Sequence, residues 1–241
     1  MPWTRGGPLT PEHRSRLLAV GADVDAVDGL PLREVTGPLP EWWLANQNTL
    51  YLADGASLRA DLVASLALYP FSDALLVLGS GTDNVASLLL GGDGATVFLG
   101  PDTELTGGDV YCGGGSAVVL NGDVTATRCA IIDARNGGSV VAERGQLWAA
   151  NVYIATDDMH RLEDLGTGAR LNPYGAHIRL GRHVWLGRDV VLTGHVDIGD
   201  GAVVGLRSVV RGQKVASNTA VAGVPARLVR EGVAWRTEDT P

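Results

Sequence analysis

The stretch HIRLGRHVWLGRDVVLTGHVDIGDGAVVGLRSVV, residues 177–210, repeats an apolar pattern every six positions. One set of positions six apart holds Ile178, Val184, Val190 and Val196, and continues with the small residues Ala202 and Ser208. A second set holds Leu180, Leu186, Leu192, Ile198, Val204 and Val210. An α-helix repeats every 3.6 residues and a half-buried strand every two, so neither explains a fixed period of six.

A unit of six residues with two inward side chains and one turn is one side of a triangular solenoid. Three units make one coil of about 18 residues, and successive coils stack at the spacing of paired strands, about 4.8 Å. Each coil buries its apolar face only against its neighbours, so the interior consists of stacked aliphatic ladders. We therefore expect Val184 to lie over Ala202, and Leu186 over Val204.

The same stretch resembles the repeats of hexapeptide-repeat acyltransferases. The stretch KVASNTAVAGVPARLVR, residues 214–230, resembles the segment that closes the last coil in that family. The resemblance is specific over residues 178–229 and implies an all-β fold, a left-handed parallel β-helix. Spacing alone does not give the handedness. Family members are usually trimers with active sites between subunits, so the resemblance also implies a homotrimer.

Upstream of residue 177, the six-residue period is looser. Apolar pairs two residues apart recur, and these are Val97 with Leu99, Val118 with Leu120, and Val152 with Ile154. They predict earlier, less regular coils over residues 95–157, with a glycine-rich antiparallel β domain as the alternative. We expect the β-helix to occupy residues 76–229, followed by a polar tail at residues 230–241 with Trp235 as its candidate anchor.

Residues 1–75 lack a clear six-residue period and are predicted to form a cap region of mixed α/β structure. Thr10 followed by Pro11 is typical of a helix start, and Gly21 of a helix end. Residues 57–69 place leucines at helical spacing, although a strand also fits them. The Trp42–Trp43 pair is expected in the core or a subunit contact rather than as a sugar platform.

Composition and charge argue against several classes of function. The net charge is -8, with no basic stripe, which argues against nucleic-acid binding. No apolar run reaches the roughly 20 residues of a membrane span, and the N-terminus lacks the apolar core of a secretory signal. Cys112 and Cys129 lie close to one coil apart and are expected to be neighbouring buried thiols rather than a disulfide framework. These features favour a cytoplasmic protein without a membrane partner.

Residues 157–177 interrupt the period and predict a protruding loop, a usual place for catalytic residues on a rigid scaffold. The loop resembles that of the family's sugar O-acetyltransferase branch. There, Asp-x-His precedes an excursion with Asn-Pro, and a coil that begins with Val-Trp follows. The matching residues here are Asp158, His160, Asn172, Pro173, Val184 and Trp185.

The resemblance implies that His160 is the general base, and the near-neutral pKa of an imidazole suits that role. A solvated loop histidine is the alternative. Asp158, or else Asp157, is the candidate to hold the imidazole tautomer. Trp185 lies between two inward residues, so its indole should point outward, where its N–H could donate to the acceptor or the thioester carbonyl. Trimer packing is the other interpretation of Trp185.

A coenzyme A site is predicted at one edge of the solenoid. Gly187, Gly205 and Gly223 follow one another at intervals of one coil and form a column without side chains. A pantetheine arm could approach the backbone there, although turn formation alone also explains glycine. Candidate contacts to the CoA phosphates follow late in the chain, and these are Arg207, Ser208, Arg211, Lys214 and Arg227.

The predicted function is transfer of acetyl from acetyl-CoA to a hydroxyl of a sugar or polysaccharide, without a metal. Transfer to the nitrogen of an amino sugar or nucleotide sugar, or to an antibiotic, uses the same chemistry. His177 and His195, one coil apart, resemble the stacked zinc ligands of γ-class carbonic anhydrases, but exposed polar positions explain them as well. A non-catalytic scaffold is the remaining alternative.

Overall fold

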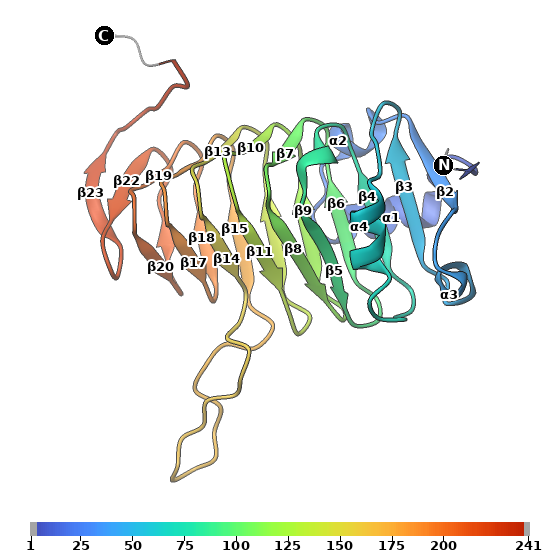
Figure 1. Cartoon of the computed structure of the whole chain (residues 1–241). Helices are drawn as coiled ribbons and strands as arrows, with labels where there is room; N and C mark the ends of the chain where they lie inside the picture. The colour runs from blue at the N-terminus through green and yellow to red at the C-terminus, as the bar shows by residue number, and fades with distance from the viewer. Residues whose placement is uncertain (1–3, 239–241) are drawn as a thin grey trace.

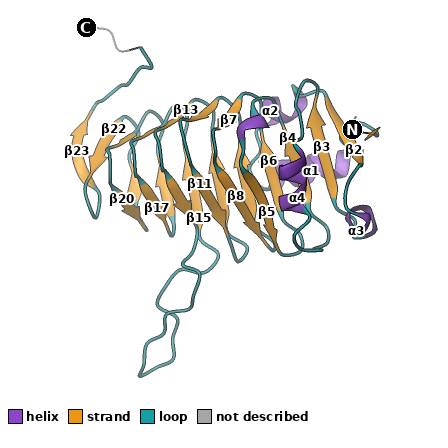
Figure 2. Ribbon diagram, viewed as in Figure 1, coloured by secondary structure: helices purple, strands orange, loops and turns teal. Residues whose placement is uncertain are grey.

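The computed structural model describes residues 4–238, which form a solenoid with three sides (Figures 1 and 2). The first sheet contains ten strands. In spatial order they are β1 (Thr4–Arg5), β2 (Leu32–Gly37), β3 (Thr49–Ala53), β4 (Leu75–Leu78), β6 (Thr96–Leu99), β9 (Ala117–Leu120), β12 (Ser139–Ala142), β15 (His177–Leu180), β18 (Val196–Ile198) and β21 (Lys214–Val215).

The second and third sheets complete the triangle. The second contains β5 (Ser87–Gly91), β8 (Asp109–Gly113), β11 (Ile131–Ala134), β14 (Tyr153–Ala155), β17 (Val191–Thr193) and β20 (Val209–Arg211). The third contains β7 (Thr103–Leu105), β10 (Val124–Ala126), β13 (Gln146–Trp148), β16 (Trp185–Leu186), β19 (Val203–Val204), β22 (Thr219–Ala222) and β23 (Arg227–Glu231). Strands of successive coils pair in parallel, and antiparallel pairing occurs at the two ends of the solenoid.

The predicted parallel β-helix is confirmed. Leu186 is paired in register with Val204, and Ile178 with Val196, so each residue meets its equivalent one predicted coil further along the chain. The six-residue sets are buried, so the solenoid interior is a continuous apolar core. The antiparallel alternative for the upstream part is wrong, because β6 pairs with β9 in parallel.

The upstream coils are longer than three six-residue units, which explains their looser pattern. Thr96 pairs with Ala117, and Cys112 pairs with Ala134, so each partner lies further along the chain than the predicted coil would place it. The predicted pair of neighbouring buried thiols is wrong for the same reason. Cys112 is buried on β8, whereas Cys129 is exposed in the connection between β10 and β11, with a φ of 52°.

Short helices gather at the N-terminal end (Figure 2). They are α1 (Pro11–Ala19), α2 (Val24–Asp28), α3 (Glu41–Ala45), α4 (Ala60–Leu66) and the 3-10 turn η1 (Thr82–Asn84). The Thr10 hydroxyl accepts from the His13 amide at 3.2 Å, as the helix-start signal predicted. Leu17 and Val27 pack with the outward-facing Phe98 and Val119, so α1 and α2 cover the early part of the first sheet.

The two remaining expectations for the cap are also met. The helix expected within residues 57–69 is α4, and Trp43 is completely buried in the core. Within residues 4–238, no helix combines the length and the apolar character needed to cross a bilayer.

Candidate active site

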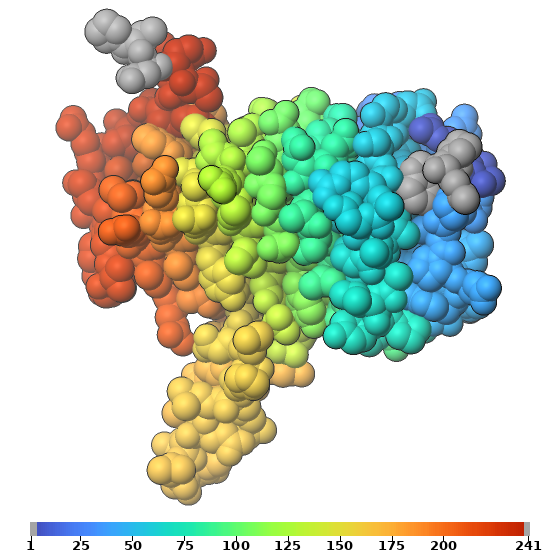
Figure 3. Space-filling view, viewed as in Figure 1, coloured from blue at the N-terminus to red at the C-terminus, as the bar shows by residue number. Residues whose placement is uncertain are grey.

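A hairpin arm, residues 157–176, leaves the solenoid between β14 and β15 and stands clear of its body (Figures 1 and 3). Glu163 and Arg170 form an antiparallel bridge, and the Leu171 amide donates to the Leu162 carbonyl at 2.8 Å. At the tip, the Asp164 carboxylate accepts from the amides of Gly166 and Thr167. The predicted protruding loop is therefore an ordered hairpin.

The root of the arm is fixed to the solenoid by Asp157. Its buried carboxylate accepts from the Gly175 amide at 3.0 Å, which ties the two strands together where they leave the coil. The Thr156 hydroxyl, 3.3 Å from the same carboxylate, accepts from the Arg135 amide at 2.9 Å. The arm therefore begins from a fixed position.

His160 lies three residues beyond this root and is exposed. The other four histidine rings each make a hydrogen bond within the protein, with Tyr51, Ser139, the Trp235 carbonyl and the His177 amide as partners. Among residues 4–238, only the His160 ring makes no such bond. Its nitrogens are free to receive a proton from a substrate, which a general base requires.

Asp158 is placed differently from the expected triad arrangement. Its carboxylate lies 3.6 Å from the Arg211 guanidinium of β20, with both side chains about half exposed. Within the described part of the chain, no hydrogen bond or ion pair joins Asp158 to His160. The structure thus brings together a residue predicted to act in catalysis and a residue predicted to bind a CoA phosphate.

Trp185 points outward from β16, as its position between two inward residues predicted, and is 40% exposed. The C-terminal tail lies beside it. Trp235 stacks on His183 with ring centroids 3.8 Å apart, and its indole N–H donates to the His183 carbonyl at 2.9 Å. The Trp185 and Trp235 rings are 6.2 Å apart. The prediction that Trp235 anchors the tail is confirmed.

The predicted column of three glycines is correct for Gly187 and Gly205, which stack on consecutive coils, but wrong for Gly223, because the last coil is one residue shorter and places Ala222 beside Gly205. A Cβ on Gly187 would lie 2.7 Å from the Leu206 amide nitrogen, and Gly223 has a φ of +101°, which favours glycine. A Cβ on Gly205 would meet that of Ala222 at 3.0 Å. Ser208 is fully buried, and its hydroxyl accepts from the Gly223 amide at 3.0 Å, so it supports this edge from inside.

The basic residues predicted near CoA are all exposed on the last coils. Arg207 lies 3.3 Å from the Asp189 carboxylate, and Lys214 lies 3.7 Å from that of Asp197. The Arg227 guanidinium donates to the neighbouring Ala226 carbonyl at 2.9 Å. These contacts are with surface groups and contribute little free energy, so a phosphate could replace them easily.

His177 and His195 lie on consecutive coils, as predicted, with ring centroids 5.8 Å apart. The His177 amide donates to His195 Nδ1 at 3.2 Å. Across residues 4–238, no three histidine, cysteine, aspartate or glutamate side chains converge on a point where they could hold a metal ion.

Sequence reasoning missed a half-buried polar cluster beside the root of the arm. Asp133 pairs with Arg135 at 2.7 Å, and the Arg135 guanidinium lies 3.9 Å over the Tyr111 ring. Burial raises the pKa of Asp133, opposed by its bond to Arg135. The signal was present in the sequence, since Asp133 and Arg135 are polar positions two apart after the apolar Ile131–Ile132 pair.

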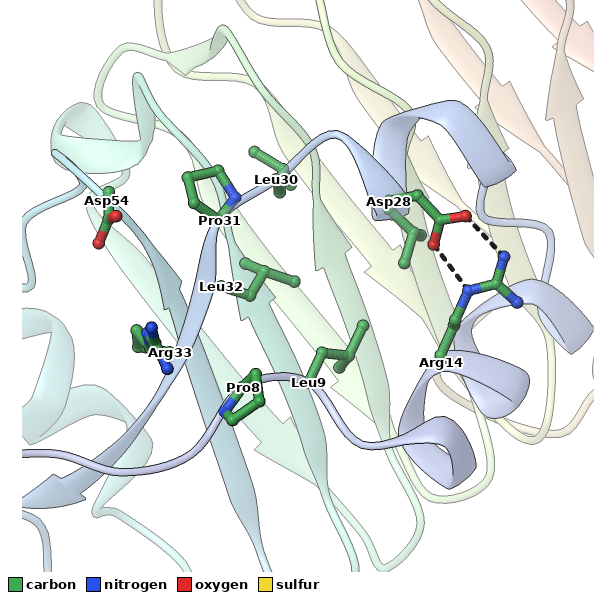
Figure 4. Close-up of a pocket in the computed structure, with 10 residues that line it drawn as sticks. Pro8, Leu9, Arg14, Asp28, Leu30, Pro31, Leu32, Arg33 and Asp54 are labelled. Carbon is green, nitrogen blue, oxygen red and sulfur yellow. Dashed lines mark hydrogen bonds and ion pairs between the residues drawn. The ribbon is translucent and has the colours of Figure 1, made fainter.

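A cavity of about 320 Å³ opens at the N-terminal cap, among α1, α2 and β2 (Figure 4). Its lining includes the apolar Leu9, Leu30 and Leu32 and the charged Arg14 and Asp28. Two hydrogen bonds of 2.6 and 2.7 Å join these charged groups and hold the pKa of Asp28 below its ordinary value. Because they satisfy each other, and the arm emerges elsewhere (Figure 1), we do not assign the cavity to the site.

Comparison with known proteins finds similar acetyltransferases by sequence and by fold. No family model matches the chain. It is 36% identical over 101 residues to WbbJ of Escherichia coli strain K12, named as a lipopolysaccharide biosynthesis O-acetyl transferase; the match covers 39% of this chain and 50% of that protein. It is 41% identical over 58 residues to the galactoside O-acetyltransferase of the same organism, covering 24% and 28% of the two chains.

The chain thus spans half the length, or less, of the curated relatives that it matches. Among solved structures, the polySia specific acetyltransferase NeuO superposes with a TM-score of 0.60 at 23% identity, covering 70% of this chain and 77% of that one. This likeness concerns the fold, and it confirms the left-handed parallel β-helix that the family resemblance implied. The predicted resemblance to hexapeptide-repeat O-acetyltransferases is also confirmed by these relatives.

Proposed function

We propose that this protein is an acyltransferase that moves an acetyl group from acetyl-CoA to a hydroxyl of a sugar or polysaccharide. The observation that carries the proposal is His160, whose ring has no partner among the described residues, on an ordered arm rooted in a rigid solenoid. Its sequence context resembles the sugar O-acetyltransferase motif. The names of the similar proteins, which are O-acetyltransferases acting on saccharides, support the same acceptor class.

In the proposed reaction, the His160 imidazole takes the proton of the acceptor hydroxyl as its oxygen attacks the thioester carbonyl. The resulting tetrahedral oxyanion accepts a hydrogen bond from the Trp185 indole or a backbone amide. Collapse of this intermediate forms the ester and breaks the carbon–sulfur bond. The departing thiolate then takes the proton from the imidazolium, which leaves CoA as a thiol and His160 neutral.

Asp158 is proposed to orient the imidazole once the substrates are bound. In the structure its carboxylate faces Arg211, so it must turn to reach His160. A CoA phosphate that binds Arg211 would release Asp158 from this pair, because a bidentate guanidinium–phosphate pair is shorter and stronger than the present contact at 3.6 Å. The two residues thus connect the CoA site to the base.

The CoA site is proposed along the edge that carries Gly187, Gly205 and Gly223, with Ser208 supporting it from inside. The phosphates would be bound by the basic side chains on the last coils, which are Arg207, Arg211, Lys214 and Arg227. No metal has a step in this reaction, because the imidazole activates the attacking hydroxyl and N–H donors stabilise the oxyanion.

The active form is proposed to be a homotrimer. The arm exposes five large apolar side chains, each at least 59% exposed, and these are Met159, Leu162, Leu165, Leu171 and Tyr174. So much apolar surface on one extension is typical of a contact with another molecule. A second copy of this chain fits, since it would enclose His160 between subunits. The two unpaired thiols support a reducing, cytoplasmic location.

The test is thermal unfolding with and without acetyl-CoA, for the wild type and for His160→Ala. A ligand that binds only the folded state raises the unfolding midpoint. We expect a rise in both proteins, because His160 serves chemistry rather than CoA binding. No rise in either protein at millimolar acetyl-CoA would contradict the proposal.

A further inference from the structure

We propose that Asn172 is a positioning residue that fixes the backbone at His160 through its side-chain amide. The inference rests on the proposed function and deepens it. Asn172 is 7% exposed, although it lies on an arm whose large apolar side chains are exposed. Its Nδ2 donates to the His160 carbonyl at 2.7 Å, and its Oδ1 accepts from the Leu162 amide at 2.9 Å.

These two hydrogen bonds hold the strand on both sides of residue 161. The root of the arm is closed by Asp157 and Gly175, and the next backbone contact between the strands joins Leu162 and Leu171. Between those two levels, one cross-strand hydrogen bond reaches the backbone of residues 158–161 in the described arm, and it runs from Asn172 Nδ2 to the His160 carbonyl. His160 therefore depends on this one side chain for its position.

Asn172 is itself held in place. Its carbonyl accepts from Arg170 Nε at 3.0 Å, and Arg170 Nη2 donates to the Pro173 carbonyl at 3.1 Å. The Arg170 guanidinium also lies 4.8 Å from the centre of the Tyr174 ring. The following Pro173 restricts Asn172 to an extended backbone. The amide is thus a fixed support rather than a mobile group.

The chemistry of the amide is specific. It places an NH2 donor group and a carbonyl acceptor side by side at the end of a short side chain, and the two contacts require one of each. Aspartate keeps the acceptor for Leu162 but loses the donor to His160, whereas alanine loses both. Since a displacement of about 1 Å at a catalytic group can lower the rate about 100-fold, the support matters for the reaction.

The experiment compares Asn172→Ala and Asn172→Asp with Glu163→Gln, which changes an exposed ion pair on the same arm. The rate of acetyl transfer and the exchange of the Leu162 amide hydrogen are both measured on the full chain. We expect kcat to fall about 10- to 100-fold in both Asn172 variants, with KM for acetyl-CoA within about twofold of wild type. The Leu162 amide should exchange faster in the alanine variant and stay protected in the aspartate variant.

A kcat within twofold of wild type in both variants would overturn the inference. So would an equal loss in Glu163→Gln, or a parallel loss of acetyl-CoA affinity, since each indicates general damage to the arm. If Asn172→Ala does not fold, Asn172→Asp decides by the same criteria. Wild-type protein that acetylates no saccharide contradicts the proposed function instead, and the Leu162 exchange then decides by itself whether Asn172 holds the strand.

Discussion

Cys112 and Cys129 show at the residue scale how surroundings determine reactivity. Cys112 is buried inside the solenoid, where burial raises the pKa of its thiol to about 12, whereas Cys129 is exposed. Only a thiolate reacts readily with a disulfide reagent. We expect one fast-reacting thiol per native chain and two after denaturation, measured with an aromatic disulfide. Cys129→Ser should remove the fast phase; two fast thiols would contradict the burial of Cys112.

The same pKa predicts how stability varies with pH. The unfolded Cys112 thiol ionises near pH 9, but the folded one remains protonated until about pH 12. Between these values the unfolded state binds fewer protons, so the free energy of unfolding falls as pH rises, with a slope of up to about 1.4 kcal/mol per pH unit. Denaturant unfolding of wild type and Cys112→Ala from pH 8 to 11 tests this. Equal slopes would contradict it.

Some features of the site could be predicted from the sequence, and others could not. The outward direction of Trp185 and the loop that carries His160 follow from the six-residue period and its interruption. The contacts of Asn172 depend on which residues face each other across the arm, and no periodicity gives that register. Likewise, Asp158 meets Arg211 because β14 and β20 lie on the same side of the solenoid, separated only by β17.

At the scale of elements, coil length decided how much of the fold could be predicted. Coils of three six-residue units keep every ladder position at a multiple of six, so residues 178–210 were predictable in register. The upstream coils add a few residues at their corners, which removes the period while keeping the paired apolar residues. The covering of the first sheet by α1 and α2 could not be predicted, because it depends on a buried cluster whose members, such as Leu17 and Phe98, lie far apart in the sequence.

The ladders predict a large stability effect at Leu186. It is fully buried and paired with Val204, so Leu186→Ala leaves a cavity and should lower the free energy of unfolding by about 2–5 kcal/mol. Leu206→Ala, at a leucine that is 67% exposed, is the matched control and should change it by less than about 0.5 kcal/mol. Denaturant titration measures both, and similar effects would mean that Leu186 is not a core residue.

The tail predicts a local effect at Trp235. Its ring stacks on His183, and its indole N–H and carbonyl both bond to that residue. Trp235→Ala should free residues 232–238, seen as faster amide exchange there with the coil strands unchanged. Trp235→Phe keeps a stacking ring but lacks the N–H donor, so we expect intermediate exchange. A tail equally protected in all three proteins would show that Trp235 does not anchor it.

At the scale of the whole molecule, the arm divides two kinds of coil. Before it, the coils are longer, as the pairing of Thr96 with Ala117 shows, and helices cover the first sheet. After it, the coils are shorter, as the pairings of Ile178 with Val196 and of Ile198 with Val215 show. The long arm occupies the corner between β14 and β15 where this change occurs (Figure 1). The helices thus cover only the early coils, and the proposed chemistry uses the later coils and the arm.

The exposed apolar side chains of the arm predict self-association. Sedimentation equilibrium should give a mass three times the 25.1 kDa of one chain. Leu165→Asp, at the fully exposed tip, should weaken the trimer by placing a charge in the contact, whereas Leu68→Asp, at an exposed leucine outside the arm, should not. A monomeric wild type at micromolar concentration would contradict the trimer.

The most direct test of the central claim measures whether acetyl transfer to a saccharide depends on His160. Purified wild type, His160→Ala and His195→Ala are incubated with acetyl-CoA and a panel of hexoses, oligosaccharides and amino sugars, and the acetylated product is identified by mass spectrometry. We predict an O-acetylated saccharide, a rate about 10²- to 10⁴-fold lower in His160→Ala, and an unchanged rate in His195→Ala. Transfer at the wild-type rate by His160→Ala would contradict the account.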